Sequence, residues 1–553
     1  MVRMKNREIG EIAYRFKTSD LSGEPREKTA LLINPPVYDT QYWAEWSQPY
    51  GLLRIARLLG DLGYKRREFF DFMEARGKHE RGERGKHERG EKGEKRVVAR
   101  RRIAPGESFV EKNTPAPKAP PYRIEKEGQC LELWKYHFGK SWDEFDAWLD
   151  ERGFTVDSPP DEVWIGAVMS YWWESARDLV GRLRRRWGNK KPLILLGGIY
   201  PSIAPQHAAE FVRPDIVVQG EVEEANDLWP DLSLYEAPPS YAIITPARGC
   251  PFNCAYCAQL TINAGMRKVR YRPVKDILAE MQTAQDTYGI KDFAFYADFL
   301  LWDHEQNLQP LLEALIADDS RFYRLYAPEG LDSKFLSQSQ RLVDLLKEAN
   351  LQKIYLPCES IDDHYLRQLN RRHVKLEHFV QAARMCERAG FDLRHMDVNA
   401  FVLYGLPGER IDDVVKSVLF VSEIVGSIIP MLFTPVPSTA LYHRYLPYFQ
   451  ERGWDEDLHM LNGKLYPFLY MNEGSVSDYV DLQRLMYALN SHYRSRSFQI
   501  FGDSMVSRAF RHNMRNGFED FVNSYKQEES RNWRKMAGDV EPDGVRVGGH
   551  ETG

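Results

Sequence analysis

Three cysteines crowd into eight positions of this 553-residue chain, in the segment Arg248-Gly-Cys250-Pro-Phe-Asn-Cys254-Ala-Tyr-Cys257. Thiolates are soft ligands, and three of them on one tight loop are able to bind three irons of a cubane cluster while its fourth iron stays open. A closed zinc site needs a fourth ligand, and neither Cys nor His recurs before His304. A disulfide is not expected in a reducing cytoplasm. The spacing Cys-x3-Cys-x2-Cys therefore predicts an iron–sulfur site.

The composition is that of a folded chain with two or three domains. Hydrophobic residues make up 43%, aromatic residues 12% and charged residues 28% of the chain, which excludes a fibrous or generally disordered protein. The formal charge of −5 gives no overall attraction to nucleic acid or anionic lipid. No apolar run reaches the roughly 18 residues of a membrane span, and the first residues lack the apolar core of a signal peptide. We therefore expect a cytoplasmic protein with neither a membrane nor a nucleic acid as partner.

The first 235 residues, called the front domain below, alternate between strand-like and helix-like segments. Strands are expected at 29–38, 68–74, 162–170, 192–202 and 215–224, with helices at 50–64, 175–187 and 204–212 between them. Five strands in this alternation predict a doubly wound, Rossmann-like parallel sheet, with a ligand crevice at the carboxyl ends of its strands. Gly197, Gly198 and Gly220 lie at two such ends.

A charged insertion interrupts this pattern. Between Glu74 and Arg102 the chain has twelve Lys/Arg and six Glu and no apolar period, and a Pro-rich stretch follows it. We expect a disordered insertion near 75–121. After it, the aromatic residues between Leu131 and Arg152 predict a helix that returns the chain to the fold.

The second half repeats the alternation and places the cysteines. Strands are expected at 242–248, 292–299, 322–328, 353–360, 397–406 and 428–436, with amphipathic helices between them. Six such units predict a partial (β/α)6 TIM-type barrel over 236–442, in which chemistry gathers at the carboxyl ends of the strands. A mainly helical region is expected over 443–535 and a disordered tail over 536–553.

The cysteine motif, with the aromatic Tyr256 before its last cysteine, resembles the signature of the radical S-adenosylmethionine (SAM) superfamily, over about residues 241–442. The resemblance implies that Cys250, Cys254 and Cys257 bind a [4Fe-4S] cluster and that SAM chelates its open iron. One electron then cleaves SAM to methionine and a 5′-deoxyadenosyl radical. Such chemistry implies an electron donor such as flavodoxin or ferredoxin.

Other strand ends match the superfamily by position. Asp298 stands where relatives have an acidic group that contacts the methionine amino group of SAM. Glu359 and Ser360 resemble the Glu-Ser pair that faces the SAM ribose and carboxylate, although a structural role for Glu359 at the barrel mouth stays open. Gly405 lies in Gly-Leu-Pro-Gly-Glu, which resembles the adenine-binding turn. Cys358 is interpreted as a small buried hydrophobe, with hydrogen donation or a covalent role as the alternative.

The front domain resembles the cobalamin (B12)-binding domain that precedes the barrel in many such enzymes. Gly197, Gly198 and Gly220 are placed to let a flat corrinoid approach the strand ends. No Asp-x-His-x-x-Gly motif is present, so no histidine is offered to cobalt, and His207 is interpreted as structural.

These resemblances predict a radical SAM enzyme, with cobalamin-dependent methyl transfer to an unactivated carbon as the first hypothesis. Three alternatives stay open. In the first, the front domain no longer binds cobalamin. In the second, the reaction is a cyclisation, rearrangement or oxidation, and in the third the protein is a non-catalytic cluster and corrinoid sensor. The substrate, a small molecule or a peptide, is not revealed by the sequence.

Overall fold

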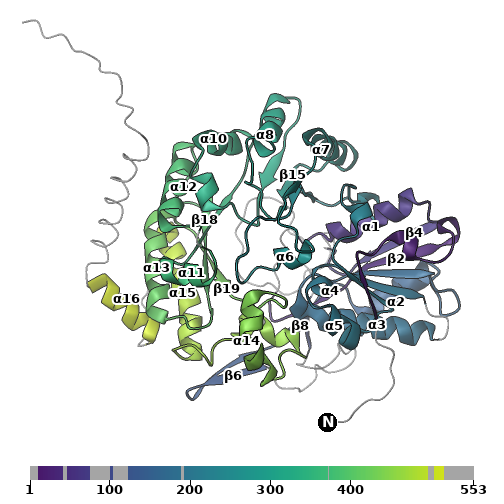
Figure 1. Cartoon of the computed structure of the whole chain (residues 1–553), viewed down its shortest axis with the longest axis horizontal. Helices are drawn as coiled ribbons and strands as arrows, with labels where there is room; N and C mark the ends of the chain where they lie inside the picture. Colours follow the sequence, from purple (N-terminus) through teal and green to yellow (C-terminus); the bar gives the residue numbers. More distant parts are fainter. Residues whose placement is uncertain are drawn as a thin grey trace, which may run out of the picture.

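The computed structural model describes residues 10–41, 47–74, 100–103, 122–188, 192–371, 373–495 and 504–515. The front domain and the barrel lie side by side, with the outer helices of the barrel arranged in an arc around its strands (Figure 1). Within the described ranges, no helix is both long and apolar enough to cross a membrane.

The front domain is built on a six-stranded sheet in which every pairing is parallel. In spatial order its strands are β4 (Arg66–Asp71), β2 (Thr29–Asn34), β9 (Glu162–Gly166), β10 (Leu193–Gly197), β11 (Ile216–Gln219) and β1 (Glu11–Tyr14). The five expected strands are present in the flavodoxin-like order 2-1-3-4-5, which has its switch point between β2 and β9. The sequence analysis missed the edge strand β1.

Helices cover both faces of this sheet because side chains alternate along each strand. On β2, Ala30 and Leu32 pack with α1 (Tyr50–Asp61). Leu31 and Ile33 pack with the opposite layer, which consists of α2 (Trp142–Glu151) and α3 (Trp173–Trp187). The short helices α4 (Ile199–Ile203) and α5 (Pro205–His207) follow β10.

The segment after the charged insertion differs from the prediction. Residues 131–138 are extended rather than helical, and the helix begins only at Trp142, where Ser141 and Glu144 form a capping box. A hairpin of β6 (Tyr122–Lys126) and β7 (Gln129–Leu133) comes first. It is followed by β8 (Lys135–Phe138), which pairs antiparallel with β3 (Val37–Asp39) and β5 (Arg100–Ile103).

Within the predicted insertion, the structure describes the four residues of β5. Residues 75–99 and 104–121 lie outside the described residues, as does the predicted tail over 536–553.

The barrel has the six expected strands, in two hydrogen-bonded sheets of three. These are β12 (Tyr241–Ile244), β15 (Asp292–Phe295) and β16 (Arg324–Tyr326), then β17 (Ile354–Glu359), β18 (Val398–Tyr404) and β19 (Ile428–Leu432). A parallel bridge between Leu325 and Leu351 joins the two halves. The outer helices are α7 (Val274–Tyr288), α8 (Leu308–Ala317), α10 (Gln340–Glu348), α12 (Leu376–Arg388) and α13 (Ile411–Ile424).

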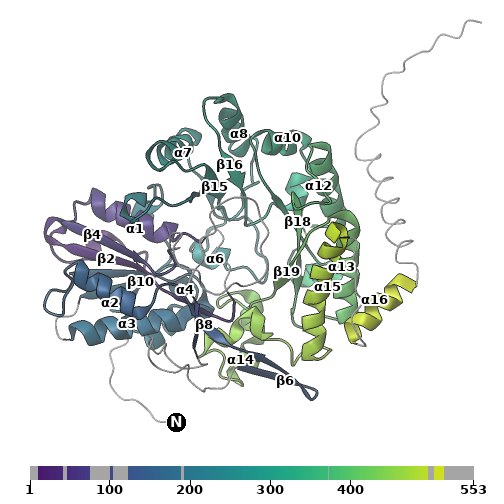
Figure 2. The ribbon, with the colours of Figure 1, turned by 180° about the vertical axis from the view of Figure 1, so that it is seen from behind.

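The C-terminal region is mainly helical where it is described, as expected. It contains α14 (Ala440–Gln450), α15 (Val476–Ser495) and α16 (Met505–Arg515). Figure 2 shows α15 and α16 beside α13 at the outer edge of the barrel. The side-chain amide of Asn490 on α15 pairs with both backbone groups of Ile428, each at 2.7 Å. This contact satisfies the backbone groups of Ile428 at the edge strand β19.

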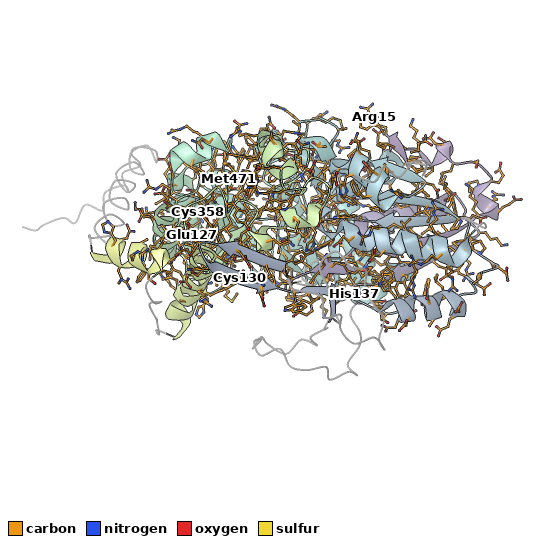
Figure 3. All side chains as sticks on the ribbon, turned by 90° about the horizontal axis from the view of Figure 1, so that it is seen from below. Arg15, Glu127, Cys130, His137, Cys358 and Met471 are labelled. Carbon is orange, nitrogen blue, oxygen red and sulfur yellow. The ribbon has the colours of Figure 1, made fainter. Side chains whose placement is uncertain are left out.

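Two of the cysteines outside the motif have clear structural positions (Figure 3). Cys130 is exposed on the β6–β7 hairpin. Cys358 is buried and belongs to the apolar core with Ile354 and Leu356, which share its face of β17. The structure therefore agrees with the interpretation of Cys358 as a small buried hydrophobe.

Candidate functional site

The cysteine loop, residues 248–257, lies at the mouth of the barrel between β13 (Ala247–Arg248) and α6 (Gln259–Ile262). The neighbouring segments fix it from two sides. The Ala255 amide donates to the carbonyl of Leu369 at 2.8 Å, and the Ala255 carbonyl accepts from the amide of Leu441 at 2.8 Å. Gly249 has a φ of +99°, and a Cβ at this position would overlap the backbone of Lys268. Only glycine fits there.

The surroundings of the loop disfavour ionisation of its three thiols. Burial is the main cause that raises the pKa of all three, and it raises that of Cys257 to about 12. Repulsion from Cys254 raises the pKa of both Cys250 and Cys257 further. Three thiolates are therefore stable here only when a cationic centre binds them.

A [4Fe-4S] cluster fits this donor set. Within the described ranges, no three His, Cys, Asp or Glu side chains converge on one point as a single ion requires. A cubane does not need such convergence, because each cysteine binds a different iron.

A buried ion-pair network surrounds the second cysteine. Arg371 donates from Nε to Glu359 Oε2 at 2.9 Å, and its Nη1 lies 3.7 Å from the sulfur of Cys254. The hydroxyl of Tyr256 donates to the other oxygen of Glu359 at 2.7 Å. The structure thus joins three sequence-predicted residues, Cys254, Tyr256 and Glu359, through an arginine that the sequence analysis did not identify.

The backbone at Glu359 supports a special role for this residue. Its φ is +59°, in the left-handed region that residues other than glycine seldom adopt. The pairing of β17 with β18 shifts register at the same place, between Pro357 and Glu359. At this bulge the Glu359 carboxylate accepts from the hydroxyl of Tyr256 in the cysteine loop.

An outer set of contacts supports Arg371. Its Nη2 lies 3.8 Å from Asp332 Oδ2, and His373 Nε2 lies 3.5 Å from the same oxygen. The ring of His373 stacks on Phe252 of the cysteine loop, with ring centroids 3.8 Å apart. These contacts fix the segment around Arg371 against the loop.

Asp298, the predicted contact for the methionine amino group, already holds the cysteine loop. Its Oδ2 accepts from the amide of Gly249 at 2.6 Å and from Asn263 Nδ2 at 3.0 Å. The same oxygen lies 3.9 Å from Arg248 Nε. The carboxylate is therefore next to the first cluster cysteine.

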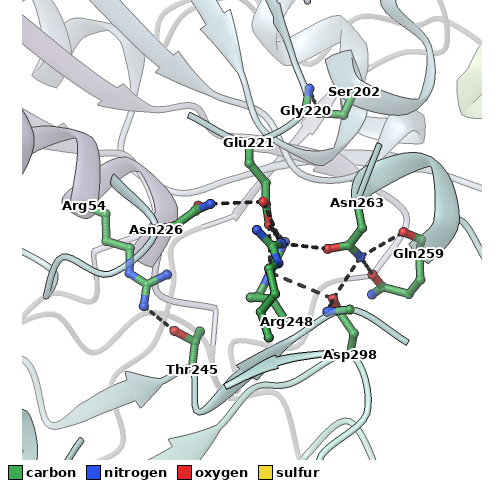
Figure 4. Close-up of polar contacts among 12 residues, drawn as sticks. Arg54, Ser202, Gly220, Glu221, Asn226, Thr245, Arg248, Gln259, Asn263 and Asp298 are labelled. Carbon is green, nitrogen blue, oxygen red and sulfur yellow. Dashed lines mark hydrogen bonds and ion pairs between the residues drawn. The ribbon is translucent and has the colours of Figure 1, made fainter. Parts of the chain in front are cut away.

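The front domain reaches this site through Glu221, which follows Gly220 at the end of β11. Glu221 accepts from Arg270 Nη2 at 2.7 Å and from Arg248 Nε at 3.3 Å (Figure 4). Helix α4, which follows Gly198, contacts α6, which follows Cys257. The carboxyl ends of the front-domain strands therefore face those of the barrel strands, with the cysteine loop between them.

The other predicted SAM contacts are held by their own strand-end turns. Gly405 has a φ of +84°, and its amide donates to Glu409 Oε1 at 2.9 Å. Asn472 accepts from the amide of Gly408 at 2.8 Å and donates to the carbonyl of Leu406 at 2.7 Å. The hydroxyl of Ser360 accepts from the amide of Asp362 at 3.1 Å. Both turns are therefore fixed by hydrogen bonds within the protein.

The front-domain glycines differ in what they contact. A Cβ at Gly198 would overlap the carbonyl oxygen of Ala167, so this glycine is required by the packing of the chain itself. Gly197 is in ordinary contact with Val218, whereas a Cβ at Gly220 would meet open space. Among these three glycines, only Gly220 combines a positive φ with free space at the strand end.

His207 has the structural role that the sequence analysis assigned to it. Its Nδ1 bonds with the hydroxyl of Tyr200 at 2.7 Å and its Nε2 with the carbonyl of Glu456 at 3.1 Å. Burial lowers its pKa to about 4. Both ring nitrogens are therefore engaged within the protein.

Sequence reasoning missed Arg371, Glu221 and Glu329. Arg371 directly follows Leu369-Asn370, a polar turn with no spacing signal of its own. Glu221 directly follows Gly220, and no motif of its own distinguishes it in the sequence. Glu329 follows β16 and is exposed near Asp298 and Arg248. Its position, a charged residue just after a barrel strand, is the sequence signal that identifies it.

Comparison with known proteins assigns the barrel. Residues 244–421 match the model of the radical SAM superfamily. The ribosomal protein uS12 methylthiotransferase RimO of Citrifermentans bemidjiense is 26% identical over 200 residues, 34% of this chain and 41% of RimO. The bacteriochlorophyllide d C-8(2)-methyltransferase of Chlorobaculum tepidum is 24% identical over 301 residues, 46% of this chain and 62% of that enzyme. The chain thus spans between two fifths and about three fifths of the length of these curated relatives.

The fold similarity extends beyond the barrel. The radical SAM methyltransferase TsrM from Kitasatospora setae, solved with tryptophan and a SAM analogue, has a TM-score of 0.52 at 14% identity. This alignment covers 76% of each chain, far more than the barrel alone. A second TsrM structure, with cobalamin and a [4Fe-4S] cluster bound, has a TM-score of 0.50, also at 14% identity, over 75% of this chain and 77% of that one. The likeness shows a shared fold, and the segment that matches the radical SAM superfamily model, residues 244–421, contains the three cysteines of the loop.

Proposed function

We propose that the protein is a cobalamin-dependent radical SAM methyltransferase that acts on an unactivated carbon. One observation carries the proposal. The strand ends of a flavodoxin-like sheet face the cysteine loop directly, and Glu221 connects the two. A ligand on the front domain would therefore lie opposite a cluster on the loop. The named activities of the curated relatives, which include methyl transfer, support the same conclusion.

The residues of the chain have separate tasks in this proposal. Cys250, Cys254 and Cys257 hold the cluster, and Arg371 places a positive charge beside one of its sulfurs. Asp298 and Glu359 fix the loop and face the SAM site, and the turn at Gly405 receives the adenine. Gly220 leaves space for a corrinoid at the end of β11. When bound, the cluster and SAM supply a one-electron cleavage of the sulfonium, and the corrinoid supplies a methyl carrier.

Other parts of the proposal concern the surroundings of the enzyme. We propose that a small electron-transfer protein such as flavodoxin or ferredoxin reduces the cluster, and that the protein works in the cytoplasm. The division into a front domain over 1–235, a barrel over 236–442 and a helical region over 443–535 is likewise proposed.

The test is anaerobic reconstitution of the full chain, followed by product analysis with SAM, cobalamin and a strong reductant. We expect about four irons per chain, formation of 5′-deoxyadenosine, and formation of S-adenosylhomocysteine as the corrinoid is methylated. Replacement of Cys250, Cys254 and Cys257 by Ala should remove the iron and the deoxyadenosine. Cys130→Ala, on the exposed hairpin, is the matched control and should change neither.

Each other outcome selects an alternative. Deoxyadenosine without corrinoid methylation would favour cyclisation, rearrangement or oxidation. A stable cluster that never cleaves SAM would favour the sensor. Iron that survives the triple replacement would show that the site is elsewhere.

A further inference from the structure

We propose that Glu221 of the front domain is a positioning residue for the cysteine loop, so that the SAM site is completed by the neighbouring domain. The proposal rests on the proposed function only in that the cysteine loop holds the cluster. It concerns how one carboxylate on the front domain sets the geometry of a site on the barrel.

A continuous chain of polar contacts leads from Glu221 to the loop (Figure 4). Both carboxylate oxygens of Glu221 accept from Arg270 Nη2, at 2.9 and 2.7 Å. The same nitrogen donates to Asn263 Oδ1 at 3.3 Å. Asn263 then donates from its own nitrogen to Asp298 at 3.0 Å. Asp298 finally accepts from the amide of Gly249, which precedes Cys250.

A second branch is shorter. Arg248 lies between the two carboxylates, 3.3 Å from Glu221 and 3.9 Å from Asp298. Its Nη1 also donates to the hydroxyl of Tyr50 on α1, at 3.1 Å. The side chain of Arg248, which begins the cysteine loop, therefore contacts two groups from the front domain, Glu221 and Tyr50, as well as Asp298.

Charge and burial make this network sensitive to Glu221. The Glu221 and Asp298 side chains are only 13% and 6% exposed, and they balance two guanidinium groups. Without the charge of Glu221, Arg248 and Arg270 lose their nearest carboxylate, and in the described part of the chain Asp298, with Glu329 beside it, is left to balance them. Partly buried cations without a counter-charge are costly, so both arginines would compete with Gly249 for Asp298.

The backbone of the cysteine loop has no free space into which it can shift. Gly249 is packed against the backbone of Lys268 with a positive φ. A displaced Asp298 therefore alters the position of Cys250 and of the groups that face SAM. Because Glu221 directly follows Gly220, we further expect that a corrinoid at this strand end changes the affinity for SAM, and that SAM changes the affinity for the corrinoid by the same factor.

The experiment compares Glu221→Gln with Glu223→Gln in the reconstituted full chain. Gln keeps the size of the side chain and removes its charge, and Glu223 is an exposed carboxylate two residues further along. Iron content, the melting curve, the paramagnetic resonance spectrum of the reduced cluster and the dissociation constant for SAM are measured for each. None of these readouts needs turnover.

We expect Glu221→Gln to keep its iron, to shift the spectrum of the reduced cluster, and to weaken SAM binding about tenfold. Glu223→Gln should match the wild type. Adding Arg270→Gln to Glu221→Gln removes the guanidinium that has lost its counter-charge, and it should restore part of the SAM affinity. An unchanged spectrum and SAM affinity in a folded Glu221→Gln protein would overturn the proposal. So would a double variant whose loss of SAM affinity equals the sum of the losses in the Glu221→Gln and Arg270→Gln single variants.

Titration of SAM with and without hydroxocobalamin tests the coupling. The wild type should show a change in SAM affinity that Glu221→Gln lacks. If the wild type binds no cobalamin, the proposed methyl transfer fails, whereas the spectrum and SAM affinity in the absence of cobalamin still decide the role of Glu221.

Discussion

Removal of the Arg371 charge should lower the reduction potential of the cluster. The guanidinium lies 3.7 Å from the sulfur of Cys254, and hydrogen bonds and charges near cluster sulfurs set the potential. A positive charge stabilises the reduced state, which carries one more electron. The Arg371→Gln variant should therefore be harder to reduce than the wild type.

The size of this effect follows from the contacts. A unit charge at 3.7 Å from another is worth about 4–5 kcal/mol at an effective dielectric constant of about 20. The added electron is spread over the cluster, and Glu359 at 2.9 Å offsets part of the Arg371 charge. We therefore retain about a third of this energy, roughly 1.5 kcal/mol, which corresponds to a potential lower by about 60 mV.

The assay is a redox titration of the cluster without SAM, followed by paramagnetic resonance. Arg371→Lys keeps the charge and should recover most of the potential, although it loses the planar geometry. The exposed Arg367 on the neighbouring helix α11 (Asp363–Gln368) provides the control, Arg367→Gln, which should not move the potential. Equal potentials for Arg371→Gln and the wild type would refute the electrostatic role of Arg371.

Two further predictions concern stability. Burial raises the pKa of Glu409 to about 8, whereas the unfolded chain releases this proton near pH 4.5; the folded state thus binds one more proton between these values, and stability falls as the pH rises. Between pH 6 and pH 8 the free energy of unfolding in urea should fall by about 2 kcal/mol more for the wild type than for Glu409→Gln. Parallel pH profiles of the two proteins would contradict this. Gly198 and Gly220 both have a positive φ, but only at Gly198 would a Cβ overlap the chain. Gly198→Ala should therefore cost about 3 kcal/mol and Gly220→Ala about 1 kcal/mol; equal losses would show that the close approach at Ala167 is unimportant.

Periodicity predicted the barrel well because its helices have one apolar face. The amphipathic helices expected between the barrel strands are present, among them α7 and α8. The segment over 131–140 was misread because Trp134 and Phe138 have helical spacing, whereas Tyr136 and Phe138 have the alternation of a strand, and so short a run fits both. Strand β1 has four residues and pairs only with β11, so local sequence alone did not predict it.

The cysteines were predictable because their spacing is itself the signal. Their partners were not, because they depend on tertiary structure. Arg371 is 117 positions from Cys254, and Glu221 is 49 positions from Arg270. No local pattern relates these residues, and only the folded chain brings them together.

The front-domain glycines show why a sequence pattern needs a physical cause before it supports a function. Glycine at the strand ends predicted the close approach of a corrinoid, but Gly198 is required by the carbonyl of Ala167. Loss of corrinoid binding in a bulky Gly198 variant would therefore report damage to the sheet. Gly220 has open space, and large apolar side chains are exposed after β9, at Val168 and Met169, and after β10, at Ile199. A flat macrocycle at this edge would be held by such apolar surface, so substitutions there and at Gly220 separate ligand binding from folding.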